Sequence, residues 1–161
     1  MKIRQASLED AARICEIYNP FILDTTVTYE LEAVSVEAMR ERILAKQRKH
    51  DWLVAEDESG VLGYGYYGRF RERAAYDHVV ESSIYLAPQA RGKGLGTLLY
   101  NAIIHRAHEQ GYREMIGVVA LPNPASAALH ESLGFAAVGT LVRSGFKFGR
   151  YLDTGIWQKS I

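Results

Sequence analysis

The stretch Arg91-Gly92-Lys93-Gly94-Leu95-Gly96 joins a run that favours a strand to a run that favours a helix. Upstream, residues 79–86 are rich in β-branched and aromatic side chains, and Pro88 then stops strand pairing. Downstream, apolar residues recur at helical spacing between positions 95 and 107. Three glycines at such a junction allow a tight turn, and the free N–H groups of the first helical turn favour an anion. The stretch therefore predicts a phosphate or pyrophosphate site at residues 92–97.

Two nucleotide-binding patterns compete for the same glycines. A dinucleotide fingerprint needs G-x-G-x-x-G in a regular βαβ unit with an acidic residue after the second strand, whereas the spacing here is G-x-G-x-G. A triphosphate-binding loop needs G-K-[S/T] after four spacer residues, and the chain lacks it. A glycine-rich turn without a ligand is the plain structural alternative.

Composition narrows the class of protein. With 161 residues the chain suits one domain, and its hydrophobic content of 48% and charged content of 24% are ordinary for a globular protein. The formal net charge is zero, so we expect neither a nucleic acid nor a membrane surface as partner. The single cysteine, Cys15, excludes an internal disulfide and a cysteine-built zinc site, and we expect no metal. No run is long enough to span a membrane and residues 1–5 lack a signal-peptide core, which favours a cytoplasmic protein.

The N-terminal third is predicted to hold one short strand and two helices. The strand covers residues 2–5, and Ser7 then caps a helix that ends near Asn19-Pro20. Residues 21–34 are expected to be irregular or extended, and Ser35 caps the second helix. The buried stripe of the first helix is predicted to consist of Leu8, Ala11, Ala12 and Cys15.

The rest of the chain is predicted to alternate strands with two further helices. A glycine at position 111 ends the helix that follows the glycine turn, and Asn123-Pro124 begins a short helix that ends at Leu133-Gly134-Phe135. The predicted strands cover residues 52–56, 61–67, 79–86, 113–119, 136–147 and 151–158. This order indicates an α/β fold with a mixed, mostly antiparallel sheet.

The glycine turn also resembles a known signature. Arg91–Gly96 is similar to the R/Q-x-x-G-x-G/A acetyl-CoA motif of the GNAT superfamily, and Asn123–Phe135 resembles the segment that flanks the pantetheine arm there. The resemblance implies the GNAT (acyl-CoA N-acyltransferase) fold, a mixed, mostly antiparallel sheet flanked by helices. It also implies one domain over residues 1–161 and acetyl-CoA as co-substrate.

Three further stretches resemble the phosphinothricin and methionine sulfoximine N-acetyltransferase family. They are residues 25–30, 73–82 and 145–158. The resemblance implies a homodimer that acetylates the α-amino group of a small amino-acid analogue. Phosphinothricin-specific members tend to carry histidines where Phe148 and Leu152 stand and a tryptophan at His78. The chain therefore looks more like the methionine sulfoximine or sulfone branch, with a broader range of amino-acid analogues.

Two residues are implied to move protons. Glu81 corresponds to the proposed base of the family, and a base is needed because a free amino group is largely protonated near neutral pH. His130 stands where many members carry the tyrosine that protonates the departing thiolate. The structural alternatives are a solvated or arginine-paired Glu81 and a locally hydrogen-bonded His130. For Tyr100, which is similar in position to a residue near the active site, core packing is favoured.

The cofactor residues follow from the same resemblance. Backbone N–H groups near the splayed end of the strand are the expected donors to the oxyanion, and the glycine turn would hold the pyrophosphate. Asn123 also fits a plain helix cap. The implied acetyl-CoA-binding residues are Ile84, Tyr85, Leu86, Arg91, Gly92, Lys93, Gly94, Leu95, Gly96, Thr97, Asn123 and Ser126.

The acceptor is expected to bind through Arg73 and Tyr76, with Tyr29 and Lys147 as wall residues. An arginine fork suits the carboxylate of an amino acid. Two other classes stay open: a non-catalytic acyl-CoA sensor, and an acetyltransferase for a protein N-terminus or an aminoglycoside. The base argues against the sensor, and the neutral charge argues against a polycationic drug. Since Cys15 is predicted to be buried far from these motifs, direct transfer is favoured over a covalent enzyme intermediate.

Overall fold

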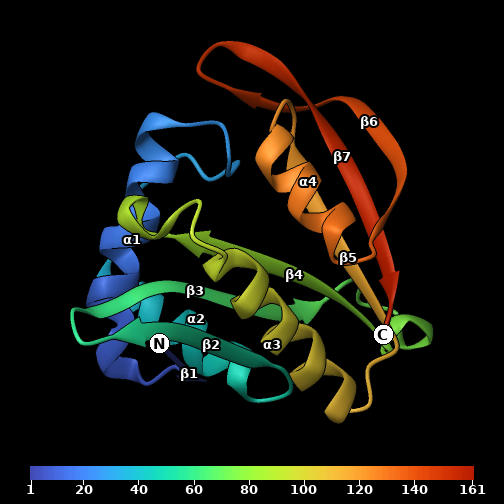
Figure 1. The fold of residues 1–161 in the computed structure, drawn as a ribbon. Helices are drawn as coiled ribbons and strands as arrows, with labels where there is room; N and C mark the ends of the chain where they lie inside the picture. The colour runs from blue at the N-terminus through green and yellow to red at the C-terminus, as the bar shows by residue number, and fades with distance from the viewer.

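One mixed sheet of seven strands runs through the molecule, in the order β1-β2-β3-β4-β5-β7-β6 (Figure 1). The computed structural model describes all residues from Met1 to Ile161. Only the β4–β5 pair is parallel, so the predicted mixed, mostly antiparallel sheet is confirmed. The strands are β1 (Lys2–Gln5), β2 (Asp51–Asp57), β3 (Gly60–Arg69), β4 (Val79–Leu86), β5 (Glu114–Ala120), β6 (Ala136–Lys147) and β7 (Arg150–Ser160).

Four α-helices cover the two faces of this sheet. They are α1 (Ala11–Asp24), α2 (Val36–Gln47), α3 (Leu95–Glu109) and α4 (Pro124–Ser132). The predicted caps of α2 and α4 are confirmed, because Ser35 Oγ accepts a hydrogen bond from the N–H of Ala38 and Asn123 Oδ1 accepts one from the N–H of Ser126. None of the helices is both long and apolar enough to cross a bilayer.

The first helix is longer than the sequence predicts. It continues through Pro20 to Asp24, so the predicted end at Asn19-Pro20 is wrong. Proline removes one backbone donor, but the turn that follows it carries Ile22, which is only 1% exposed. The burial of that turn against the sheet outweighs the missing hydrogen bond.

The predicted buried stripe of α1 is half right. Ala11 and Cys15 are buried, whereas Leu8 and Ala12 are exposed. Residues 8–10 form a separate 3-10 turn, in which Asp10 Oδ2 accepts a hydrogen bond from the N–H of Ser7 at 2.8 Å. Leu8 therefore lies outside α1, and the buried face of that helix adds Ile14, Ile17, Tyr18 and Ile22 to Ala11 and Cys15.

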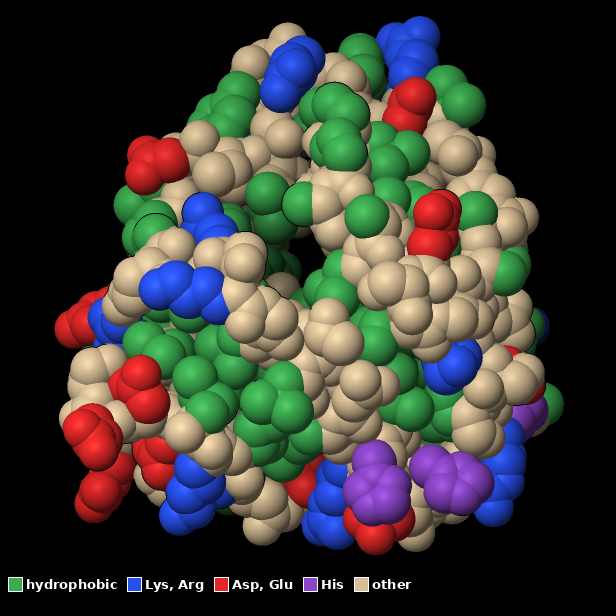
Figure 2. All heavy atoms as spheres, in the orientation of Figure 1, with side chains coloured by type: hydrophobic (Ala, Val, Ile, Leu, Met, Phe, Trp, Pro, Cys, Tyr) green, Lys and Arg blue, Asp and Glu red, His purple; other side chains and the backbone are tan.

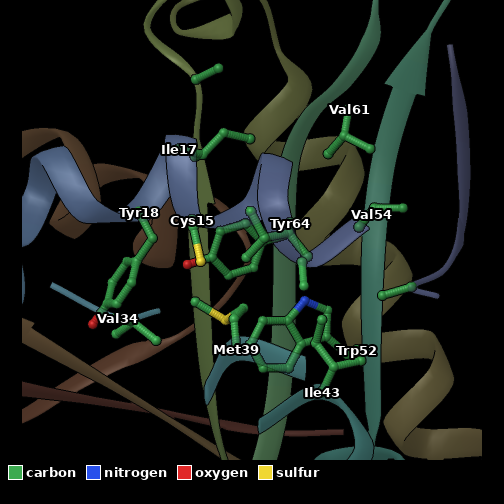
Figure 3. Packing of buried hydrophobic residues seen from close by; sticks show 14 of the residues in the cluster. Cys15, Ile17, Tyr18, Val34, Met39, Ile43, Trp52, Val54, Val61 and Tyr64 are labelled. Atoms are coloured by element: carbon green, nitrogen blue, oxygen red, sulfur yellow. The ribbon is translucent and has the colours of Figure 1, made fainter. Parts of the chain in front are cut away.

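The two faces of the sheet have separate cores. On the first face, α1 and α2 pack over Trp52, whose ring stacks on that of Tyr64 with 5.4 Å between centroids (Figure 3). The Trp52 ring also stacks on Tyr66 at 4.3 Å. On the second face, α3 packs over β3 and β4, with Leu99 and Ile103 fully buried. Residues that alternate along one strand therefore belong to different cores.

The strands β4 and β5 part halfway along their length. They pair from Val79 with Glu114 as far as Ser82 with Gly117, after which β4 continues on β3 alone and β5 on β7 alone. In Figure 1 the two halves of the sheet diverge from this point, with α3 on one side and α4 on the other. The end of β4 near Ile84–Leu86 is therefore splayed away from β5, as expected from the resemblance.

A methyl group at Gly65 tests the packing of α3 on the sheet. A Cβ there would lie 2.2 Å from Ile103 Cδ1 and 3.0 Å from the carbonyl oxygen of Ser83. We expect Gly65→Ala to lower the free energy of unfolding by about 1–3 kcal/mol, because the core is overpacked. Urea unfolding measures the change. Gly139→Ala is the control, since nothing lies within 4 Å of that Cβ position; equal losses in both variants would contradict the packing.

Candidate active site

A cleft fills the space where β4 and β5 part. Its wider part has a volume of about 450 Å³, and its deeper part reaches Ser82, Tyr100 and His130. Figure 2 shows this face hollowed between the half of the molecule that carries α1 and the half that carries α4. Most of the predicted acetyl-CoA residues line the wider part, namely Ile84, Tyr85, Leu86, Arg91, Gly92, Gly94, Gly96, Thr97, Asn123 and Ser126.

The glycine turn is open toward the cleft. Gly92 and Gly94 have φ angles of +72° and +79°, and nothing lies within 4 Å of the Cβ position of either one. Gly94 caps α3, and the first hydrogen bond of the helix runs from the N–H of Leu98 to the carbonyl of Gly94. The N–H groups of residues 95–97 therefore lack helical partners and are available to an anion. The turn fits the pyrophosphate of a coenzyme A molecule.

Arg91 lies at the rim of the same cleft. Its Nε and Nη2 atoms donate to the carbonyl oxygen of Leu86, each at 3.4 Å, and its guanidinium lies 4.9 Å from the centre of the Phe21 ring. Two predicted cofactor residues point elsewhere. Lys93 lines a separate cavity beside Met1, and Leu95 is buried in the core under α3. Consecutive side chains of a turn point to different sides, and the sequence motif does not specify which of them face the cleft.

A buried hydrogen-bonded chain lies at the deep end of the cleft. The hydroxyl of Tyr100 lies 2.5 Å from Ser82 Oγ and 3.0 Å from His130 Nε2. The other ring nitrogen, Nδ1, lies 2.7 Å from the carbonyl oxygen of Ser126. A carbonyl only accepts, so Nδ1 carries the proton and Nε2 accepts a hydrogen bond from Tyr100.

The environment of His130 keeps its ring neutral. The side chain is only 4% exposed, and burial lowers its pKa below the ordinary histidine value despite the hydrogen bond to the Ser126 carbonyl, which acts the other way. The imidazole takes the place of a side chain on β5, because a Cβ at Gly117 would lie 2.4 Å from His130 Nε2. A glycine at this position of β5 is therefore required for the Tyr100–His130 contact.

Glu81 lies on the other face of β4, next to Ser82 in the chain. Successive strand residues point to opposite faces, so the carboxylate and the Tyr100–His130 pair approach the parting of the strands from opposite sides. Glu81 is half-buried, and it takes part in none of the side-chain hydrogen bonds or ion pairs of the structure. Burial raises its pKa, while the positive charges of Lys46 and Arg71 lower it. This combination suits a general base.

The predicted acceptor residues Arg73 and Tyr76 lie outside the cleft. They line an open pocket between β3 and β4, in which Tyr76 packs edge-on against Phe70 with 5.7 Å between ring centroids. Arg73 is exposed and precedes the 3-10 turn of residues 74–76. A direct contact of either residue with an acceptor stays a prediction.

Tyr29 and Lys147 fasten the loop between α1 and α2 to the last two strands. The Tyr29 hydroxyl lies 2.7 Å from Thr154 Oγ1, and Lys147 Nζ donates to the carbonyl oxygen of Thr28 at 2.8 Å. Lys147 is only 2% exposed. These hydrogen bonds connect the loop to the half of the molecule that carries β6 and β7. Whether either side chain touches an acceptor stays a prediction.

The sequence analysis missed Ser82. Its expectation that Tyr100 packs in the core is confirmed, since that side chain is only 1% exposed within the cluster under α3. A serine beside Glu81 in a strand of β-branched residues is a weak signal for a polar contact. Tyr100 fits the apolar spacing of α3, so only the packing of α3 against β4 and α4 reveals its hydroxyl contacts. No three His, Cys, Asp or Glu side chains converge in a way that would hold a metal ion.

Comparisons with known proteins agree with this geometry. A family model described as "Acetyltransferase (GNAT) family" matches residues 12–135. Over 161 residues the chain is 37% identical to an "L-methionine sulfoximine/L-methionine sulfone acetyltransferase" of Pseudomonas paraeruginosa. The alignment covers 99% of this chain and 94% of that protein.

Two crystal structures extend the comparison to three dimensions. A phosphinothricin acetyltransferase from Sinorhizobium meliloti in complex with AcCoA has a TM-score of 0.95 and 41% identity, covering 99% of this chain and 88% of that one. A ribosomal-protein-alanine N-acetyltransferase from Brucella melitensis has a TM-score of 0.97 and 36% identity, covering 100% of both chains. The three relatives are named for different acceptors.

The protonation state of His130 gives a direct test of the buried chain. We expect its imidazole to titrate below the ordinary midpoint of about 6.5, since burial disfavours the charged form. Nitrogen-15 NMR across a pH series would show the neutral Nδ1–H tautomer at pH 7, and His130→Gln would identify the resonance. A midpoint above 6.5, or a protonated Nε2 at pH 7, would contradict the assigned hydrogen bonds.

Proposed function

The chain belongs to the GNAT family of acetyltransferases, and on that basis we propose that it acetylates the α-amino group of a small amino-acid analogue. The acceptor class is that of phosphinothricin, methionine sulfoximine and methionine sulfone, and acetyl-CoA is the donor. The observation that carries the proposal is the placement of Glu81 on one side of the parted strands and of the Tyr100–His130 pair on the other.

The cleft has the features that an acetyl-CoA molecule requires. The glycine turn and the first turn of α3 would hold the pyrophosphate, with Arg91 supplying a positive charge at the rim. Asn123 and Ser126 would face the pantetheine arm from α4. Beyond Ser82, the backbone groups of β4 that face β5 have no strand partner, so they are free to bond the arm and the acetyl oxygen. The bound molecule supplies an activated acetyl thioester.

The residues on the two sides would manage the protons of the transfer. The acetyl carbon forms its new bond to the amine nitrogen as its bond to sulfur breaks, and the proton of the amine goes to the Glu81 carboxylate. The departing sulfur needs a proton on the opposite side. Neutral His130 has no proton to give at Nε2, so the Tyr100 hydroxyl is the donor in this proposal. It would break its hydrogen bond to Nε2, pass its proton to the sulfur and regain a proton from solvent, to which Glu81 releases the one it took from the amine. Burial raises the pKa of Tyr100, which keeps that hydroxyl protonated.

The loop between α1 and α2, which is tied down next to the cleft, favours a small acceptor. The loop of residues 25–34 is tied to β6 and β7 through Tyr29 and Lys147, and to α2 through the ion pair between Glu30 and Arg42. A fastened loop beside the site leaves less room for a polypeptide than a mobile one would. The half-buried, unpaired Glu81 also argues against a sensor that only binds acyl-CoA, since binding does not require a costly buried carboxylate.

Direct transfer is supported by the position of the one cysteine. Cys15 is 6% exposed inside the hydrophobic cluster under α1, and burial raises the pKa of its thiol. Both features make it a poor nucleophile. We therefore propose transfer from donor to acceptor within one ternary complex. A cytoplasmic location remains part of the proposal.

A homodimer formed through the β6–β7 hairpin also belongs to the proposal. β6 is an edge strand, and its exposed fractions include 55% at Val138, 56% at Leu141 and 71% at Val142. An edge strand with this much apolar surface calls for a covering partner. A second copy of the chain would bury it by pairing the two hairpins.

Replacing the base tests the proposed chemistry. Thiol release from acetyl-CoA would be followed with phosphinothricin, methionine sulfoximine, methionine sulfone, L-amino acids and an alanine-initiated peptide. We expect turnover with at least one of the small analogues, and a fall of about 10²–10⁴-fold in kcat for Glu81→Gln. Calorimetry should show unchanged acetyl-CoA binding in the variant. Full turnover in Glu81→Gln would remove Glu81 as the base, and turnover with the peptide alone would replace the acceptor class.

Light scattering on a sizing column tests the dimer. We expect the natural protein to elute at twice the monomer mass, and Val142→Glu to elute as a monomer because two carboxylates would be buried in the interface. Leu44→Glu is the control, since that side chain is 47% exposed on α2, far from the hairpin in the fold. A natural protein that stays monomeric at micromolar concentration would refute the dimer.

A further inference from the structure

Lys46 of α2 occupies the space that a side chain would fill on β3. A Cβ at Gly68 would lie 2.4 Å from Lys46 Nζ and 3.2 Å from both Cδ and Cε. Gly68 is the cross-strand partner of Glu81. Side chains of directly paired residues lie next to one another on one face of a sheet. The Lys46 ammonium therefore stands in the place of the missing neighbour of Glu81.

The two charges are close without forming a contact ion pair. No nitrogen–oxygen distance between Lys46 and Glu81 falls within 4.0 Å. The lysine is instead supported by the Tyr66 ring, with Nζ at 5.5 Å from its centroid. The carboxylate oxygens of Glu81 thus keep their lone pairs free, while a positive charge lies at short range in a half-buried setting where electrostatic interactions are strong.

Few other charged groups act on Glu81. Tyr66 of β3 contributes a neutral hydroxyl. Arg71, which follows β3, lowers the pKa of Glu81 by less than Lys46 does. Tyr100 of α3, on the opposite face of the sheet, contributes a neutral hydroxyl, and the β5 neighbour of Glu81 is the apolar Ile116. Lys46 is the strongest of the charges that oppose the effect of burial on Glu81.

We propose that Lys46 is a positioning residue for the reaction, whose ammonium holds Glu81 in the ionised form needed to accept a proton and leaves the carboxylate oxygens free for the acceptor amine. The inference rests on the proposed role of Glu81 as the base. Gly68 is needed for this arrangement, because any side chain at that position would displace the Lys46 ammonium.

The pH dependence of kcat/KM distinguishes this role from a structural one. A base must be ionised, so activity rises with pH through the pKa of Glu81 and the acidic limb of the profile reports it. Without the nearby positive charge that pKa rises. We expect Lys46→Met to move the acidic limb upward by about one pH unit. Gly68→Ala should move it in the same direction, since it displaces the ammonium without removing it.

Two matched variants complete the set. Lys46→Arg keeps a positive charge and should restore the limb toward its natural position. Lys49→Met removes an exposed lysine just after α2 that is not among the charges acting on Glu81, and it should leave the profile unchanged. Carbon-13 NMR of the Glu81 carboxyl group across a pH series measures the change in its pKa without relying on turnover.

The outcomes separate the inference from the function on which it rests. An acidic limb and a Glu81 titration that stay in place in folded Lys46→Met overturn the inference, even where Glu81→Gln abolishes turnover. Full turnover in Glu81→Gln overturns the base itself. If Gly68→Ala does not fold, Lys46→Met still decides, because this change adds no atoms against the sheet.

Discussion

The short pairing of β4 with β5 is the constraint on which the rest of the structure depends. Their hydrogen bonds stop at Ser82 and Gly117, although each strand continues on its other neighbour. Backbone N–H and C=O groups in a protein interior are nearly always hydrogen-bonded, so the groups left unpaired between the two strands call for another partner. The cleft, the helix N-terminus that faces it, the Glu81 carboxylate and the Tyr100–His130 pair all lie around this one interruption.

At two glycines of the central strands, side chains from helices occupy the space that a Cβ would fill. Gly117 on β5 makes room for the imidazole of His130, and Gly68 on β3 makes room for the ammonium of Lys46. In both places a long polar side chain reaches the sheet from a helix and lies beside a strand residue at the point where the strands part. Absence of a Cβ costs backbone entropy in a strand, and here it is offset by contacts that no larger residue would permit.

Local patterns in the sequence predicted most elements and the donor half of the site. Caps, glycine stops and the strand-turn-helix junction act within a few residues, so they were correct for α2, α3 and α4. The end of α1 was wrong because burial of Ile22 overrides the local effect of Pro20. Lys93 lines a separate cavity beside Met1, so its contact with the pyrophosphate stays a prediction.

The sequence by itself determined the family, the order of the elements, the glycine turn and the adjacency of Glu81 and Ser82, since all of these are written in consecutive residues. Only the tertiary structure decided which side chains meet. Tyr100 contacts Ser82, 18 residues before it, and His130, 30 residues after it. Lys46 of α2 lies against Gly68, the β3 partner of Glu81. These contacts depend on how α2, α3 and α4 pack on the sheet, and that packing is set by the whole core rather than by any short segment.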